Sequence, residues 1–126
     1  MIRYQYQNQI EPPAPFVLVT IRNLRSGAIR IDVPGQLDTG ADRTVVTEDI
    51  VIDLALPQTG SITVEGVGGV ITTLSIHRAE ITLPGQSPMR LEVATSAGEP
   101  WILLGRDILN GVRVVLDGPQ LILELG

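Results

Sequence analysis

Cysteine and lysine are both absent from the 126 residues of the chain. Without cysteine there can be no disulfide, no thiolate nucleophile and no thiolate metal site. Without lysine there can be no Schiff base, no lysine general base and no phosphate-binding lysine of the Walker type. Several large classes of enzyme are therefore excluded before any motif is considered.

Histidine is nearly absent, since His77 is the only one. One histidine cannot make a histidine-based metal cluster, and no G-x-S-x-G motif accompanies it to indicate a serine hydrolase. The residue falls in the strand-like segment TTLSIHRAEITL, where we expect a surface or edge position without a catalytic role. We expect no metal and no other cofactor.

Positive charge is scarce and dispersed. The formal net charge is -5, and the nine arginines are spread singly along the chain. No basic stripe is available for a nucleic-acid backbone, so we expect no nucleic-acid partner. No apolar run approaches the length of a membrane span, and the N-terminal MIRYQYQNQIEPPAP lacks the apolar region of a signal peptide. We expect a soluble, cytoplasmic protein without a membrane partner.

Aromatic residues make up only 3% of the chain, although 44% of it is hydrophobic. The core must therefore consist mainly of Val, Ile and Leu, and β-branched aliphatic residues favour strands. A chain of this length forms one domain with a core of its own. Residues 1–15 are rich in Gln and end in EPPAP, which predicts an irregular N-terminal arm or a propeptide. The packed domain is expected to be residues 16–126.

The rest of the chain alternates between short apolar runs and turn residues. FVLVTIRNL and AIRIDV flank Arg-Ser-Gly and predict a hairpin. TEDIVIDLAL predicts a short helix that begins after Thr47. Further strands, a second short helix and a final hairpin are predicted in GSITVEGVGGVITTLSIHRAEITL, MRLEVAT, WILLGRDILNG and VRVVLDGPQLILELG. The predicted fold class is all-β, with one or two short helices.

The segment GQLDTGADRTVV places Asp38 and Asp42 around a Thr-Gly turn, directly after an apolar run. Asp-Thr-Gly occurs by chance in roughly a few per cent of chains this long, and its residues are common in turns. It is therefore either an ordinary turn or half of a catalytic site. The apolar residues around it favour the second interpretation, because they would hold the loop rigid. Gly40 lets the backbone approach a neighbour, and the Thr39 hydroxyl can bind one.

One carboxylate alone is a poor peptide hydrolase. One group must deprotonate the attacking water, while another acid polarises the carbonyl and later protonates the leaving nitrogen. Two aspartates a few ångströms apart do both, because they share one proton. The chain contains one Asp-Thr-Gly, so a catalytic site would need a second copy of the chain across a two-fold axis.

Two later segments are compatible with a peptide-binding cleft. EGVGGV, from Glu65 to Val70, lies between two strand patterns and is too rich in glycine to be stiff, so it is either an ordinary turn or a flexible cover. ILLGRD, residues 102–107, is an apolar run that ends at Arg106. This arginine either lies at the surface or is half-buried against a carboxylate, for which Asp42 is the candidate.

These three segments resemble those of the retropepsins, the retroviral-type aspartic proteases, and of their bacterial relatives in particular. LDTGADRTVV is similar to the catalytic loop, EGVGGV to the flap, and ILLGRDIL to the segment before the family's helix. The resemblance covers roughly residues 16–126. It implies a closed β-barrel-like subunit that forms a homodimer, with the C-terminal LILELG in the dimer interface.

The resemblance also implies a role for each matched residue. Asp38 would be the catalytic aspartate, on a turn formed with Thr39 and Gly40. Substrate would be bound by the flap, by the catalytic loop and by two pocket residues, namely Asp42, Gly66, Val67, Gly68, Trp101 and Leu103, and Gly66 and Gly69 would be flexible positions beside the flap tip. Structural support would come from Ala41, Gly105 and Arg106.

The implied activity is that of a homodimeric aspartic endopeptidase. A water activated between two Asp38 carboxylates would attack a peptide bond in an extended, largely apolar segment. The alternative is a catalytically weak retropepsin-like module that binds peptides or dimerises. Three residues depart from the usual pattern. They are Arg43, where viral members often have an acidic or small residue, Glu65, where they commonly have glycine, and Trp101, which is bulkier than the usual aliphatic residue.

Overall fold

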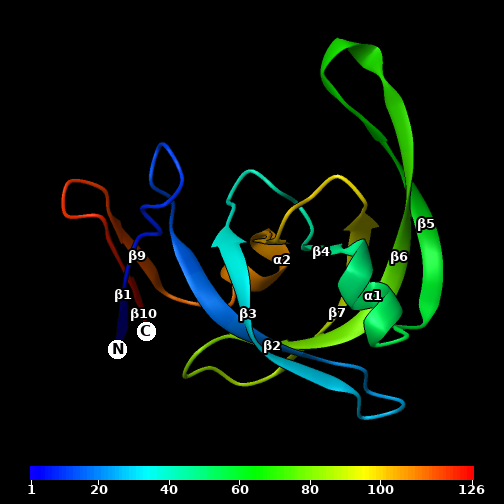
Figure 1. The fold of residues 1–126 in the computed structure, drawn as a ribbon, viewed down its shortest axis with the longest axis horizontal. Helices are drawn as coiled ribbons and strands as arrows, with labels where there is room; N and C mark the ends of the chain where they lie inside the picture. Colours follow the sequence, from blue (N-terminus) through cyan, green and yellow to red (C-terminus); the bar gives the residue numbers. More distant parts are fainter.

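A closed ring of six strands is the body of the molecule (Figure 1). The computed structural model describes residues 1–126, with strands β1 (Ile2–Gln5), β2 (Phe16–Arg22), β3 (Ile29–Leu37), β4 (Val45–Thr47), β5 (Gln58–Glu65), β6 (Ile71–Thr82), β7 (Met89–Ser96), β8 (Ile102–Leu104), β9 (Val114–Asp117) and β10 (Ile122–Leu125). Its α-helices are α1 (Glu48–Asp53) and α2 (Arg106–Leu109). Around the ring the order is β2, β3, β8, β4, β7, β6, and β6 pairs with β2 to close it. The predicted all-β class with short helices is therefore confirmed.

Aliphatic side chains fill the ring, as the scarcity of aromatic residues predicted. Every second side chain of β2 is buried, namely Val17, Val19 and Ile21. This period of two is that of a strand with one face on the core. Helix α1 adds Ile50 and Val51 to the same core and begins after Thr47, as predicted. None of the helices has the length and apolar composition needed to cross a bilayer.

An ion pair lies where the ring closes between β2 and β6. Arg22 and Glu80 are opposite each other in the strand register. The guanidinium binds both carboxylate oxygens, at 3.0 Å from Nε to Oε1 and 3.1 Å from Nη2 to Oε2. These hydrogen bonds from Arg22 hold the pKa of Glu80 below its usual value. The pair therefore remains charged at neutral pH and joins the first and last strands of the ring.

The N-terminal segment differs from the irregular arm that its composition predicted. Residues 2–5 form β1, which pairs antiparallel with β10 in a second sheet of order β1, β10, β9. Arg3 and Glu124 are opposite each other in this pairing and form an ion pair of 2.7 Å. Tyr4 packs against the core. The composition of this segment did not predict β1 because its partner, β10, comes from the other end of the chain, and no local pattern reveals such a pairing. Removal of this segment as a propeptide stays a prediction.

His77 also differs from expectation, because it is buried rather than at the surface. Only 8% of the residue is exposed. Its Nδ1 lies 2.9 Å from the carbonyl oxygen of Leu56, and its Nε2 lies 3.0 Å from Oγ of Ser75. The chain that follows α1 runs beside this part of β6, where Gln58 is paired with His77. The two hydrogen bonds give the imidazole a structural role.

Asn23 is a buried polar residue in the turn between β2 and β3. Its Nδ2 donates to the carbonyl oxygens of Leu54 and Ala55, at 2.8 and 3.1 Å, where the chain leaves α1. Its Oδ1 accepts from the backbone N–H groups of Arg25 and Ser26, at 2.9 and 3.3 Å. One side chain that is only 3% exposed thus joins the hairpin to the helix.

Asn23→Ala is expected to lower the free energy of unfolding by about 2–3 kcal/mol, because buried carbonyl oxygens lose their donors. Urea denaturation followed by circular dichroism measures this change. Asn8→Ala is the control, since Asn8 is exposed, and it should change the stability by no more than about 0.5 kcal/mol. Equal stability of Asn23→Ala and the wild type would contradict the role given to this side chain.

Candidate active site

Asp38 lies at the start of the loop that follows β3, and strand β8 holds it there. Strands β3 and β8 run parallel, with Leu37 opposite Leu104. The Asp38 N–H donates to the carbonyl oxygen of Leu104 at 2.9 Å, which extends this pairing by one residue. The Gly40 N–H donates to Oδ1 of Asp38 at 3.0 Å, and the Ala41 N–H to its carbonyl oxygen at 3.1 Å. The half-buried carboxylate is therefore held by its own turn.

The structure pairs Arg106 with Asp42, the carboxylate proposed for it. Nη2 of Arg106 lies 2.6 Å from Oδ1 of Asp42, and Nη1 lies 2.7 Å from the carbonyl oxygen of Thr39. The Arg106 N–H also donates to the carbonyl oxygen of Ala41 at 2.9 Å. The pair is more exposed than expected, with 44% of the arginine side chain and 89% of the aspartate side chain accessible. An exposed pair contributes little stability, so its main effect is to fix the shape of the loop.

Thr44 and Asp107 form a second connection between the same loops, which the sequence did not reveal. Thr44 is fully buried. Its Oγ1 donates to Oδ1 of Asp107 at 2.7 Å, and its backbone N–H donates to Oδ2 at 2.9 Å. The same hydroxyl oxygen accepts from the Gly105 N–H at 3.1 Å. In the sequence, Asp107 looked only like the start of a helix, and nothing local indicated its distant partner.

Gly105 provides the space that this connection needs. A Cβ atom at this position would lie 2.7 Å from the carbonyl carbon of Arg43 and 2.9 Å from the backbone nitrogen of Thr44. No side chain fits at such distances, so the residue before α2 has to be glycine for the loops to meet. This observation gives a physical reason for the supporting role predicted for Gly105.

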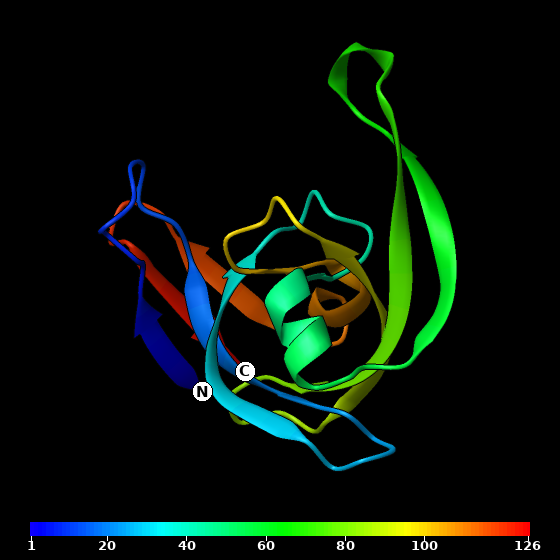
Figure 2. The same cartoon turned by 45° about the vertical axis from the view of Figure 1, so that its right-hand side comes forward.

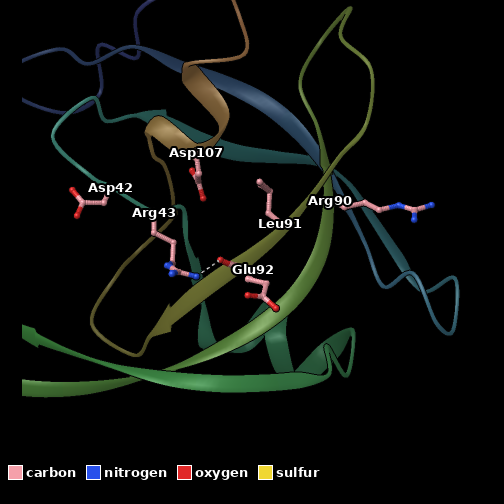
Figure 3. A pocket seen from close by; sticks show the side chains of 6 residues that line it. All are labelled: Asp42, Arg43, Arg90, Leu91, Glu92 and Asp107. Carbon is pink, nitrogen blue, oxygen red and sulfur yellow. Dashed lines mark hydrogen bonds between the residues drawn. The ribbon is translucent and has the colours of Figure 1, made fainter.

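A polar hollow of about 360 Å³ lies beside the loop rather than at Asp38 (Figure 3). Its lining residues are Asp42, Arg43, Arg90, Leu91, Glu92 and Asp107. Arg43 donates to the carbonyl oxygen of Glu92 at 2.9 Å, so its guanidinium lies against β7. No group of three or more His, Asp or Glu side chains lies close enough together to hold a metal ion.

The β5–β6 hairpin extends beyond the ring, as Figures 1 and 2 show. Its tip is a short 3-10 turn at residues 67–69, in which Gly68 and Gly69 have φ angles of 82° and 76° that favour glycine. Val67 is completely exposed, and Ile71 is 68% exposed. The tip is held by hydrogen bonds within residues 66–70, including 2.7 Å from the Gly66 N–H to the carbonyl oxygen of Val70. The hairpin tip therefore exposes apolar side chains to solvent and is held by hydrogen bonds within its own residues.

Trp101 lies beside the strand that leads to Asp38. Its indole N–H donates to Oε1 of Gln36 at 2.8 Å, and its ring meets that of Phe16 edge-on, with centroids 5.0 Å apart. Leu103 is half-buried and lies opposite Gln36 and Val45. Both predicted pocket residues are thus next to β3. Gln36 and Phe16, which hold the indole, were not identified from the sequence.

A closed barrel whose Asp-Thr-Gly loop is fastened to a Gly-Arg-Asp turn defines the retropepsin-like class of all-β domains. The family described as retroviral aspartyl protease matches residues 12–117, which is most of the chain. The chain therefore belongs to the retroviral aspartyl protease family. A comparison with curated protein sequences gives no significant match.

Solved structures of viral and bacterial proteins share this fold. The protease of EIAV in complex with the inhibitor HBY-793 is 25% identical, with a TM-score of 0.63, over 84% of this chain and 96% of that chain. A retropepsin-like aspartic protease from Rickettsia conorii is 12% identical, with a TM-score of 0.67, over 98% of this chain and 88% of that chain. The simian foamy virus protease is 18% identical, with a TM-score of 0.56, over 76% and 92%. At such low identities, the last two likenesses concern the fold alone.

Thr44→Val keeps the shape of the side chain and removes its hydroxyl. We expect a loss of about 1–3 kcal/mol in the free energy of unfolding, because the buried Gly105 N–H and a partly buried oxygen of Asp107 lose a partner. Thr63→Val is the matched control, since Thr63 is exposed on β5, and should have little effect. Chemical denaturation of both variants tests this, and equal stabilities would show that the loops are held by other contacts.

Proposed function

We propose that the protein is a homodimeric aspartic endopeptidase that hydrolyses peptide bonds in extended, largely apolar segments. The observation that carries the proposal is the position of Asp38. Its carboxylate is half-buried at the end of a barrel strand, and its turn is held by Gly40 and by Arg106. A carboxylate that is fixed in this way and remains accessible can act as a general acid or base.

The chemistry requires two copies of Asp38. In the dimer the two carboxyl groups share one proton, because both cannot ionise at close distance. The ionised Asp38 takes a proton from a water, and the water oxygen attacks the peptide carbonyl carbon. The protonated Asp38 of the partner gives its proton to the carbonyl oxygen. The first Asp38, now protonated, gives its proton to the nitrogen. The C–N bond breaks while a hydroxyl of the intermediate returns its proton to the other Asp38, so the pair again holds one proton and no covalent intermediate forms.

The contact between subunits is proposed at the sheet of β1, β10 and β9. Its middle strand, β10, is paired on both sides, and its Leu123 and Leu125 are buried in their own subunit. The C-terminal strand therefore cannot accept a partner strand without giving up one it already has. The outer edges of β1 and β9 are free, and a free edge can add a strand from another chain.

Substrate binding is proposed for the residues around Asp38. The β5–β6 hairpin acts as the flap, with Val67 and Gly68 at its tip and Gly66 and Gly69 as flexible positions beside them. Closure over a peptide would cover the exposed apolar tip and exclude water from the reaction. Asp42 binds the peptide backbone. Trp101 and Leu103 line side-chain pockets, which suits the preference for apolar segments.

Asp38→Asn is expected to reduce peptide cleavage by at least about 10³-fold, because asparagine can neither accept nor donate the shared proton. Cleavage profiling on a diverse peptide library measures the activity and the specificity together. Asp32→Asn is the matched control, since Asp32 is exposed and its φ of 54° suits asparagine. Activity that survives in Asp38→Asn would refute the mechanism. A wild type that cleaves neither the library nor itself would favour the peptide-binding module instead.

Mixing subunits tests the need for two Asp38 residues. At a fixed total concentration, an equal mixture of exchanged wild-type and Asp38→Asn chains should retain about a quarter of the wild-type activity, since only dimers with two intact copies are active. Subunits that act singly would retain about half. Labelled chains and native mass spectrometry verify that exchange is complete, and a value of one half after full exchange contradicts a shared site.

A further inference from the structure

Three arginines that are far apart in the sequence line one hollow at the base of the ring. Arg25 lies in the β2–β3 turn, Arg78 on β6 and Arg90 on β7, and with Leu24 and Pro57 they surround about 370 Å³. The arginines are spread singly along the sequence, as predicted, but the fold brings these three together. Strand β3 starts after the β2–β3 turn, which carries Arg25, and ends at the Asp38 loop; Figure 1 shows the turn and the loop at opposite ends of the strand. The strand therefore separates the two sites, although Arg90 also lines the hollow beside Asp42.

The positive charge in this hollow is largely uncompensated. No acidic residue is among those that line it. No carboxylate lies within 4.0 Å of the Arg25 or Arg90 guanidinium. Figure 3 shows the Arg90 side chain directed away from Asp42, Arg43 and Glu92. Like charges gathered in one hollow of an acidic protein repel one another and favour an anion between them.

Two carboxylates lie near the hollow, and neither neutralises the positive charge of its arginines. Glu80 is opposite Arg90 in the register of β6 and β7, but both of its oxygens bind Arg22. Glu92 lies 3.4 Å from Arg78, and both side chains are about half exposed, at 48% and 57%. An exposed pair of this length is weak, so a ligand of higher charge can displace it.

The backbone around the hollow is fixed by buried groups. The Arg25 N–H donates to Oδ1 of Asn23, which is 3% exposed and also binds the end of α1. The Arg78 N–H donates to the carbonyl oxygen of Pro57 at 3.0 Å. These bonds hold the β2–β3 turn, the chain after α1 and β6 in one frame. The ligand therefore has to order the arginine side chains but not the backbone, which lowers the entropic cost of binding.

We propose that this hollow binds an oxyanion of the phosphate type, either free or as a phosphoryl group on a peptide. The planar guanidinium donates two parallel hydrogen bonds to such oxygens, and three of them suit a ligand with several oxygens and more than one negative charge. A carboxylate offers only two oxygens and a single charge. Leu24 and Pro57 complete the lining, and the three exposed arginine side chains are accessible to a ligand from solvent. The site is separate from Asp38 and does not depend on the proposed protease activity.

The experiment is a calorimetric titration of the intact protein with sodium tripolyphosphate, with ionic strength held constant by sodium chloride. We expect saturable binding to the wild type. Arg25→Gln and Arg90→Gln should each weaken it by at least about tenfold. Arg113→Gln is the matched control, since Arg113 is exposed, outside the hollow and without an ion pair, and should change the affinity less than about twofold. Thermal unfolding verifies that all three variants are folded.

Further arms identify the source of the oxyanion. Inorganic phosphate, a phosphoserine peptide and the same peptide with glutamate in place of phosphoserine are titrated under the same conditions. Tighter binding of the phosphopeptide than of phosphate assigns the site to phosphorylated chains, and the reverse assigns it to free anions; both support the proposal. It is overturned if the glutamate peptide binds as well as the phosphopeptide, if Arg113→Gln weakens binding as much as Arg90→Gln, or if tripolyphosphate does not bind.

Discussion

The contact between Thr44 and the carboxylate of Asp107 is the interaction on which the rest of the site depends. It joins the loop after β3 to the start of α2, across 63 residues of sequence. Thr44 is fully buried and shields one side of the contact, while Asp107 remains partly open to solvent. The neighbouring bonds from Arg106 to Thr39 and Asp42 are exposed and would be weak alone, yet the contact between Thr44 and Asp107 holds the same two loops together.

The barrel separates two requirements of the carboxylate that we propose for catalysis, namely a stable fold around it and a fixed position. Stability comes from aliphatic side chains packed within the ring, where almost no polar group is needed. Precision comes from hydrogen bonds at one end of it, where Leu104 holds the backbone of Asp38 and Gly40 holds its carboxylate. A change in the core therefore affects mainly how much protein is folded, while a change in the loops also affects where the Asp38 carboxylate lies.

Much of the fold could be predicted because its signals are local. The β2–β3 hairpin, α1 after Thr47 and the glycine-rich hairpin tip each follow from neighbouring residues. The pairing of Arg106 with Asp42 could be proposed because opposite charges stood at the ends of two apolar runs. The burial of His77, the partner of Thr44 and the strand formed by residues 2–5 could not, because each depends on segments far away in the chain.

The sheet of β1, β10 and β9 has a consequence for how the chain folds during its synthesis. Strand β1 pairs with β10, so residues 2–5 must wait until residues 122–125 have been made. The ribosome adds about 5–20 residues each second, so β1 remains without its partner for several seconds. Contacts of such long range also slow folding after release. This sheet therefore cannot be completed until β10 has been made, whereas all six strands of the ring lie within residues 16–104.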